Sequence, residues 1–251
     1  HDTASSLLNL EPGQKFDLDT LLSMTKDSLF SKRSLTTTGF EPIDNIISGM
    51  TKGEITIFAG RPGNAKTTTV ANIARNLVLA GKKVFMFDNI SNLEGTFREI
   101  RRIKPDVVID DHIGLIEYPT NDMRDLRLKI GDTSRKYKWL CKSEEMSVIL
   151  VSQLNRNIEY RTERIPKLSD LAESGNLEQD AEIVAFTHYP WTVNFENAKH
   201  GKFGLDIVVA KNRYGSTGKA TVGFSPDTCT LYDTIEEAEA SVAAQMPDVP
   251  F

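Results

Sequence analysis

A short glycine-containing loop carries the residues best suited to bind phosphate. It consists of Gly60, Arg61, Pro62, Gly63, Asn64, Ala65, Lys66 and Thr67, with Thr68 directly after it. The pattern follows that of a phosphate-binding loop, G-x-x-x-x-G-K-[ST], whose backbone N–H groups form a nest for an anion. The lysine of such a loop contacts the β- and γ-phosphates, and the next hydroxyl binds Mg²⁺. We therefore expect Mg²⁺ and ATP, or another nucleoside triphosphate, to bind at residues 60–68.

The elements on either side of this loop fit the same prediction. Residues 54–60 form a short apolar run, which predicts a buried strand, and residues 66–80 show apolar side chains at helical spacing. A helix N-terminus placed after a strand is itself suited to anions. The loop departs from the pattern at Ala65, which replaces the second glycine. If this position needs a positive φ, the methyl group costs roughly 1–2 kcal/mol.

A nucleotide site of this kind also needs an acidic group that holds the metal ion. Residues 105–111, with the sequence PDVVIDD, predict a strand that ends in two carboxylates, Asp110 and Asp111. Ligands of open α/β sheets bind at the carboxyl edge of the strands. Because side chains alternate along a strand, we expect only one of these aspartates to face the nucleotide. The pattern itself leaves both open as the metal ligand.

The remaining hydrophobic pattern predicts the fold that positions these groups. Short apolar runs occur at residues 84–87, 107–109, 148–151, 183–186 and 205–209, with helical segments between several of them, notably 123–142. Strands that alternate with helices predict an α/β fold with a mostly parallel, twisted sheet and helices on both faces. Residues 205–210, 219–224 and 228–232 are joined by short turns, which predicts an antiparallel C-terminal edge.

Composition excludes several classes of protein. The 251 residues, 39% of them hydrophobic, suffice for one globular domain with short appendages. No stretch approaches the roughly 20 apolar residues of a membrane span. Cys141 and Cys229 indicate neither a disulfide framework nor a zinc site, so we expect an intracellular, reducing compartment. The net charge of −5 comes entirely from the acidic residues after position 232, so it neither supports nor excludes binding to nucleic acid.

Three further segments carry a specific resemblance. They are VSQLNR at 151–156, SDLAESGNLEQDA at 169–181 and KNRYG at 211–215. In this order after the phosphate loop, they resemble the motor domain of DnaB-type replicative helicases and of the related phage primase-helicases. The resemblance covers residues 38 to 233 and implies a RecA-like P-loop NTPase fold. It also implies a location in the cytoplasm of a bacterial or phage-infected cell.

The resemblance assigns roles in nucleotide hydrolysis. Residues 111–116 match the family's metal-binding strand, which selects Asp111 over Asp110. Gln153 matches the residue that senses the γ-phosphate and passes the signal toward DNA. Lys211 and Arg213 match a pair that reaches into the neighbouring subunit's site, where an arginine finger is worth roughly 10³–10⁵ in rate. The resemblance thus implies a cyclic, head-to-tail homo-oligomer, expected to be a hexameric ring.

The same comparison assigns a segment to single-stranded DNA. The matching residues, which in the family line the central channel, are Glu173, Ser174, Gly175 and Asn176. The family often has a basic residue at the position of Ala172. Arg156 and three other basic residues nearby, Arg161, Arg164 and Lys167, are substitutes, although a solvated basic loop explains them equally well.

Two features of the catalytic machinery stay open. Relatives carry a glutamate after the second strand that activates the attacking water, and Asp88 is the candidate here. Only about 19 residues separate Phe87 from Val107, fewer than in relatives. Either the motor is abridged here or, as we favour, a stretch near residues 89–93 is absent from this sequence. Tyr232, in the last predicted strand, is a candidate to stack on the nucleotide base, with a packing role as the alternative.

Together these observations predict three parts and one leading function. The parts are a linker with a short docking helix at 1–33, which could equally be an arm folded on its own domain, a motor domain at 34–233, and an acidic tail at 234–251. We expect an ATP-driven helicase motor that moves on single-stranded DNA at a replication fork, with a primase, polymerase or loader as further partners. The alternatives are a recombinase or clock-type ATPase of the same fold, and a nucleotide-dependent scaffold with degraded catalysis.

Overall fold

The described part of the chain is built around one eight-stranded sheet. The computed structural model describes residues 35–88, 92–111, 113, 123–161, 164–171 and 175–244. The predicted linker at 1–33, the end of the tail at 245–251, and Glu173 and Ser174 lie outside these residues. None of the described helices is long and apolar enough to cross a membrane.

The sheet has the predicted mixed topology. Its order is β10-β9-β8-β7-β3-β6-β5-β4, in which the strands from β7 to β4 are parallel and β8, β9 and β10 run antiparallel. The bounds are β3 Ile55–Gly60, β4 Val84–Phe87, β5 Val107–Asp110, β6 Ser147–Gln153, β7 Ile183–His188, β8 Gly204–Asn212, β9 Gly218–Ser225 and β10 Thr230–Tyr232. The central strands are almost wholly buried, as expected for apolar runs covered on both faces. A separate two-stranded sheet pairs β1, Leu35–Thr36, with β2, Met50–Thr51.

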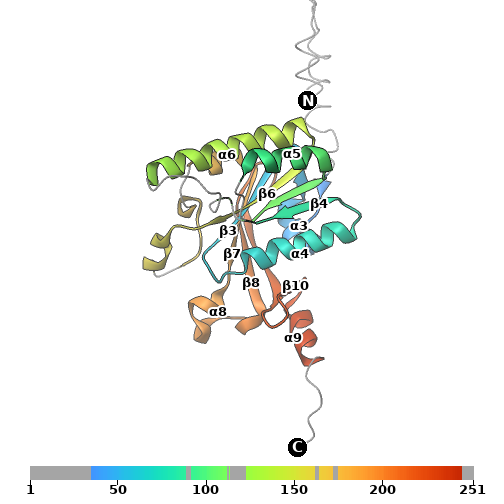
Figure 1. The fold of residues 1–251 in the computed structure, drawn as a ribbon. Coiled ribbons are helices and arrows are strands. Elements are labelled where there is room, and N and C mark those ends of the chain that lie inside the picture. The colour runs from blue at the N-terminus through green and yellow to red at the C-terminus, as the bar shows by residue number, and fades with distance from the viewer. Residues whose placement is uncertain are drawn as a thin grey trace, which may run out of the picture. The chain divides into compact units, whose positions relative to one another are not determined.

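Helices cover both faces of the sheet (Figure 1). On one face, α3 (Glu41–Ile47) and α4 (Lys66–Leu79) pack their buried side chains against one apolar cluster. On the other face, α5 (Leu93–Ile103), α6 (Met123–Ser143) and α7 (Gly175–Asp180) contribute to a second cluster. The predicted α/β fold, with its antiparallel C-terminal edge, is confirmed.

Short helical turns connect the strands on the side of the phosphate loop. They are η2 Arg156–Tyr160, η3 Leu168–Asp170, α8 Pro190–Val193, η4 Phe195–Asn197 and η5 Gly201–Phe203. The last three lie between β7 and β8, a stretch in which the sequence analysis names no element.

The acidic C-terminal segment begins with a helix, which the sequence analysis did not predict. Residues Ile235–Ala243 form α9, whose N-terminus is closed by a capping box between Thr234 and Glu237. Ala238 is buried, and Gly223 of β9 lies so close that a Cβ there would stand 1.9 Å from the Thr234 carbonyl oxygen. The acidic residues are in the first turn, where a helix favours negative charge, and they do not prevent ordered packing.

Candidate nucleotide site

The phosphate loop has a conformation that suits an anion. Ala65 has φ 53° and ψ 30°, in the left-handed region, and α4 begins at the next residue without a hydrogen bond from a capping side chain. The first N–H groups of α4 therefore lack the side-chain acceptor that usually serves them. Ala65 does adopt the positive φ at which a Cβ is costly, so it carries strain that a glycine would avoid.

Contacts from neighbouring segments fix the loop in place. The buried Asn64 side chain accepts a hydrogen bond of 2.7 Å from the backbone N–H of Tyr189, just after β7. Arg61 donates to the Leu154 carbonyl oxygen at 3.0 Å and forms an ion pair with Glu159. The loop thus joins the ends of three neighbouring strands, β3, β6 and β7. Sequence reasoning missed these anchors because they link positions about 90 to 125 residues apart.

Lys66 lies at the start of α4 with its ammonium close to the loop. Its Nζ donates to the Arg61 carbonyl oxygen at 3.1 Å. Burial lowers the pKa of Lys66, and the nearby Arg61 acts in the same direction, whereas the charge of Asp111 opposes the change. A partly desolvated ammonium beside uncapped N–H groups is suited to a polyphosphate. Thr67 is exposed at the same helix end, where its hydroxyl is accessible to a metal ion.

The two aspartates at the end of β5, Asp110 as its last residue and Asp111 directly after it, have different surroundings, as alternation predicts. Asp110 is fully buried and accepts a hydrogen bond of 2.8 Å from the Tyr137 hydroxyl of α6. Burial raises the pKa of Asp110 to about 7, and the charge of Asp111 adds to the rise. Asp111 interacts electrostatically with Lys66 and so lies on the side of the phosphate loop. Of the two, Asp111 is placed to hold a metal ion near the phosphates.

Gln153 and Asp88 lie at the same carboxyl edge. Gln153 ends β6 and pairs directly with Gly60, the first residue of the loop, and its side chain is exposed. Asp88 follows β4, one residue beyond the pairing of Phe87 with Asp110, and is also exposed. The strand order puts β6 next to β3 and puts β4 at the far edge of the sheet. Gln153 is therefore next to the loop, whereas Asp88 is three strands away.

Lys211 and Arg213 lie at the opposite edge of the sheet. The backbone N–H of Arg213 donates to the Glu182 carbonyl oxygen at 2.9 Å. The backbone N–H of Glu182 donates in turn to the Ile55 carbonyl oxygen, also at 2.9 Å. Ile55 starts β3, whereas the phosphate loop follows its end at Gly60. At about 3.3 Å per residue, the length of β3 separates the level of Arg213 from its own loop by roughly 17 Å.

One candidate for the nucleotide site, Tyr232, is not brought to the phosphate loop. Tyr232 follows Leu231, which is hydrogen-bonded to Asn72 within α4, and precedes Asp233, which accepts from the N–H of Glu41. This places Tyr232 beside the middle of α4 and not at its N-terminus.

The described DNA-binding candidates lie on two other elements. Arg156 is exposed at the start of η2, close after Gln153 in the chain. Gly175 and Asn176 form the first residues of α7.

A cleft beside the loop was not expected from the sequence. It has a volume of about 170 Å³ and is lined by Arg61, Pro62 and Asn64 of the loop, together with residues that follow β6 and β7. Among these are Arg164 and His188, whose pKa is lowered by burial. The cleft therefore extends the candidate site from the phosphate loop toward η2 and α8.

Comparison with known proteins assigns the chain to a family. The family model described as the DnaB-like helicase C-terminal domain matches residues 36–92 and 88–233. The chain belongs to this family. Its two matched segments overlap at residues 88–92, where the sequence analysis expects a stretch to be absent, and that expectation stays a prediction.

Relatives and solved structures agree with this assignment. The replicative DNA helicase DnaB of Geobacillus stearothermophilus is 25% identical over 246 residues, which cover 74% of this chain and 54% of the relative. A solved structure of an isolated ATPase domain superimposes with a TM-score of 0.69 at 20% identity, covering 88% of this chain and 99% of that one. A DnaB-like replicative helicase, solved in a study of its interactions with primase, gives 0.72 at 20% identity, covering 92% and 71%. The RecA-like fold is thereby confirmed, and the chain spans about half the length of the curated relatives it matches.

Proposed function

We propose that this chain is the motor domain of a ring helicase that hydrolyses a nucleoside triphosphate to move along single-stranded DNA. Membership of the DnaB-like family and the arrangement of the candidate site both support this function. The main structural support for this function is that Lys66, Asp111 and Gln153 lie together at one edge of the sheet. They lie beside the N-terminus of α4, which has no side-chain cap.

Each residue of this edge has a role that follows from its chemistry. The loop N–H groups and Lys66 would bind and orient the phosphates, while Thr67 and Asp111 would hold the metal ion. When bound, the magnesium nucleotide supplies the phosphoanhydride bond to be cleaved, and the metal offsets the phosphate charge. Gln153, which pairs with the first residue of the loop, would sense the terminal phosphate. Asp88 remains the candidate for orienting the attacking water, at a greater distance along the sheet edge.

The position of Arg213 supports the proposal of a site shared between subunits. Arg213 and Lys211 lie at the sheet edge opposite their own phosphate loop, so they cannot reach their own nucleotide. A second copy, docked with its loop against this edge, would receive both cations. Such a head-to-tail contact repeats around a ring, and a hexamer is the proposed form.

DNA binding is proposed for the segment 173–176, whose last two residues begin α7. Residues 173–176 would hold the sugar–phosphate backbone, with Arg156 as an additional phosphate contact. A primase, polymerase or loader would join the assembled ring. The DnaB-like helicase solved in a study of its interactions with primase is the relative that suggests the first of these partners.

The test is nucleotide hydrolysis with and without single-stranded DNA, comparing the wild type with Arg213→Ala. We expect hydrolysis by the wild type to be stimulated by DNA and to fall at least 100-fold in the variant. Mixing Arg213→Ala subunits with Lys66→Ala subunits should restore part of the activity, because each variant supplies what the other lacks. Nucleotide binding without any turnover would instead identify a nucleotide-dependent scaffold and overturn the motor.

A further inference from the structure

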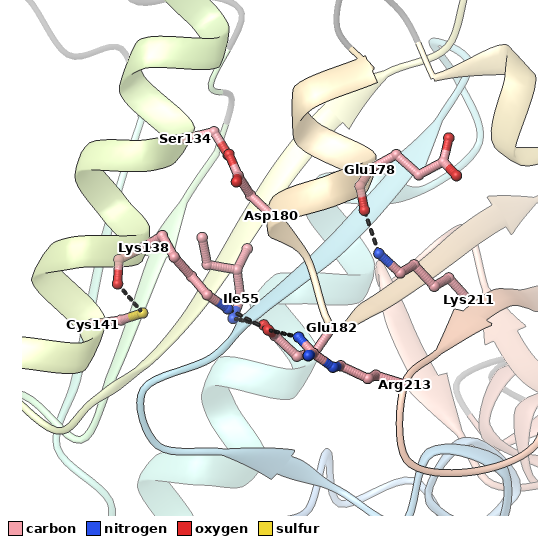
Figure 2. Close-up of polar contacts among 9 residues, drawn as sticks. All are labelled: Ile55, Ser134, Lys138, Cys141, Glu178, Asp180, Glu182, Lys211 and Arg213. Carbon is pink, nitrogen blue, oxygen red and sulfur yellow. Dashed lines mark hydrogen bonds and ion pairs between the residues drawn. The ribbon is translucent and has the colours of Figure 1, made fainter. Parts of the chain in front are cut away.

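The Glu182 carboxylate contacts residues from three other parts of the fold: β3, α6 and the turn directly after β8. It follows α7 and is almost fully buried, with 5% of its side chain exposed. One oxygen accepts from the backbone N–H of Ile55 at 3.1 Å, and the other is shared by the Lys138 ammonium of α6 and the Arg213 guanidinium. Figure 2 shows Lys138 and Arg213 approaching this carboxylate from opposite sides.

The two cations are held differently. Lys138 has only 18% of its side chain exposed and forms a close ion pair with Glu182. Arg213 reaches the same oxygen through Nη1 alone, at 3.4 Å, and 63% of its side chain remains exposed. Lys138 and the Ile55 N–H therefore fix the carboxylate, and the carboxylate in turn orients one nitrogen of Arg213. Most of the guanidinium, which carries five N–H donors, stays accessible for a phosphate.

Lys211 is secured by the same part of the chain. Its ammonium donates to the Glu178 carbonyl oxygen near the end of α7 (Figure 2). Lys211 and Arg213 stand two residues apart; Lys211 contacts α7 itself and Arg213 contacts Glu182, just after α7. α7 and the residues that follow it thus hold the two cations together at the sheet edge.

We propose that Glu182 is a positioning residue for Arg213, aligning its guanidinium for the phosphate of a neighbouring subunit. This rests on the proposed function, in which Arg213 acts in trans. The physical reason is orientation. A long arginine side chain at an exposed edge samples many rotamers, and a fixed carboxylate that holds one nitrogen removes much of that freedom before the neighbour arrives. Glu182 itself does not touch the nucleotide.

The test variant must avoid leaving a buried charge without its partner. Glu182→Gln alone would strand the Lys138 ammonium, so the informative protein is Glu182→Gln combined with Lys138→Met. The glutamine oxygen can still accept from the Ile55 N–H. Lys138→Met alone is the matched control, because it removes the neighbouring cation and retains the carboxylate for Arg213.

We expect the double variant to lose at least about 10-fold in kcat for nucleotide hydrolysis, with KM within threefold of the wild type. The control should keep kcat within threefold. Its thermal unfolding midpoint should fall, because the buried Glu182 carboxylate loses the closer of its two cations, so all proteins are assayed well below their midpoints. The split between kcat and KM in the double variant reflects an effect on the transferring phosphate and not on nucleotide binding. A double variant with the kcat of the control would overturn the proposal.

Subunit mixing separates positioning in trans from damage within the variant subunit. Double-variant subunits have an intact phosphate loop, and Lys66→Ala subunits carry a correctly held Arg213. Mixing the two should therefore restore as much hydrolysis as mixing Arg213→Ala subunits with Lys66→Ala subunits. Restoration of Arg213→Ala without restoration of the double variant would refute the role of Glu182 and leave the shared site standing. If Arg213→Ala hydrolyses nucleotide as fast as the wild type, the proposed function itself fails.

Discussion

Replacing Asp110 with asparagine is expected to change how the free energy of unfolding depends on pH. Asp110 is fully buried between the sheet and α6, and one of its oxygens has no hydrogen-bond partner among the described residues. The other accepts from the Tyr137 hydroxyl at 2.8 Å. Burial raises its pKa from 3.8 to about 7 in the folded protein, although the Tyr137 hydrogen bond lowers it.

The sign and size of the effect follow from these two values. Below pH 4 the carboxyl is protonated in both the folded and the unfolded chain, and its contribution to stability is fully present. Between pH 4 and 7 only the unfolded chain ionises, so the free energy of unfolding falls as pH rises. Above pH 7 both states are ionised and the loss is complete. A difference of about three in pKa, at about 1.4 kcal/mol each, gives a total loss of roughly 4 kcal/mol.

The assay is urea unfolding at several pH values between 4.5 and 8.5, in metal-free buffer, for the wild type and Asp110→Asn. Asparagine is uncharged throughout, so subtracting its free energy of unfolding removes the contribution of other titrating groups. Its amide leaves a buried N–H without a partner at about 1–3 kcal/mol, a cost that shifts the curve without changing its slope. The difference between the two proteins should fall by about 1 kcal/mol per pH unit around pH 6.

Tyr137→Phe provides a second check on the same reasoning. It removes the hydroxyl whose hydrogen bond lowers the pKa of Asp110, so the pH range of the loss should extend above 7. A difference between wild type and Asp110→Asn that stays constant within 0.5 kcal/mol, roughly the error of such measurements, would show that burial does not keep this carboxyl protonated.

Two backbone positions give further predictions. Ala65→Gly should raise the free energy of unfolding by about 1 kcal/mol, since it removes a Cβ from a residue at φ 53°. The midpoint of urea unfolding measures this change, and a lower midpoint would show that the loop is not strained there. Gly223→Ala should destabilise the protein by about 3 kcal/mol or release α9, because its Cβ would lie 1.9 Å from the Thr234 carbonyl oxygen. Gly218→Ala is the matched control, with only the Ile46 side chain at 3.6 Å, and equal losses in the two variants would contradict the argument.

The sequence was sufficient to predict the parallel sheet and the phosphate loop. Each central strand is an apolar run covered on both faces, and this pattern is visible over four to seven neighbouring residues. The loop lies between a strand and a helix, so its surroundings are also local in sequence. Gln153 could be placed beside Gly60 only once the order of β3 and β6 was known.

Other features depend on long-range register and could not be predicted. The contacts of Glu182 join it to Lys138 and Arg213, which are 44 and 31 residues away. A shift of one residue in the register between β7 and β8 would separate Glu182 from Arg213. α9 was missed for a different reason, because the capping box from Thr234 to Glu237 is a local signal that the acidic composition obscured.

One continuous stretch of chain connects the places that a motor must coordinate. It begins at α7, whose first two residues belong to the segment proposed to hold DNA, and passes through Glu182, which contacts Arg213. It then forms β7, in the middle of the sheet, and ends at Tyr189, whose N–H holds Asn64 of the phosphate loop. β7 is buried and paired on both sides, so it resists bending. A displacement at one end therefore moves the whole strand. We therefore expect DNA contact, alignment of the finger and the shape of the phosphate loop to change together, which is the coupling that a helicase motor requires.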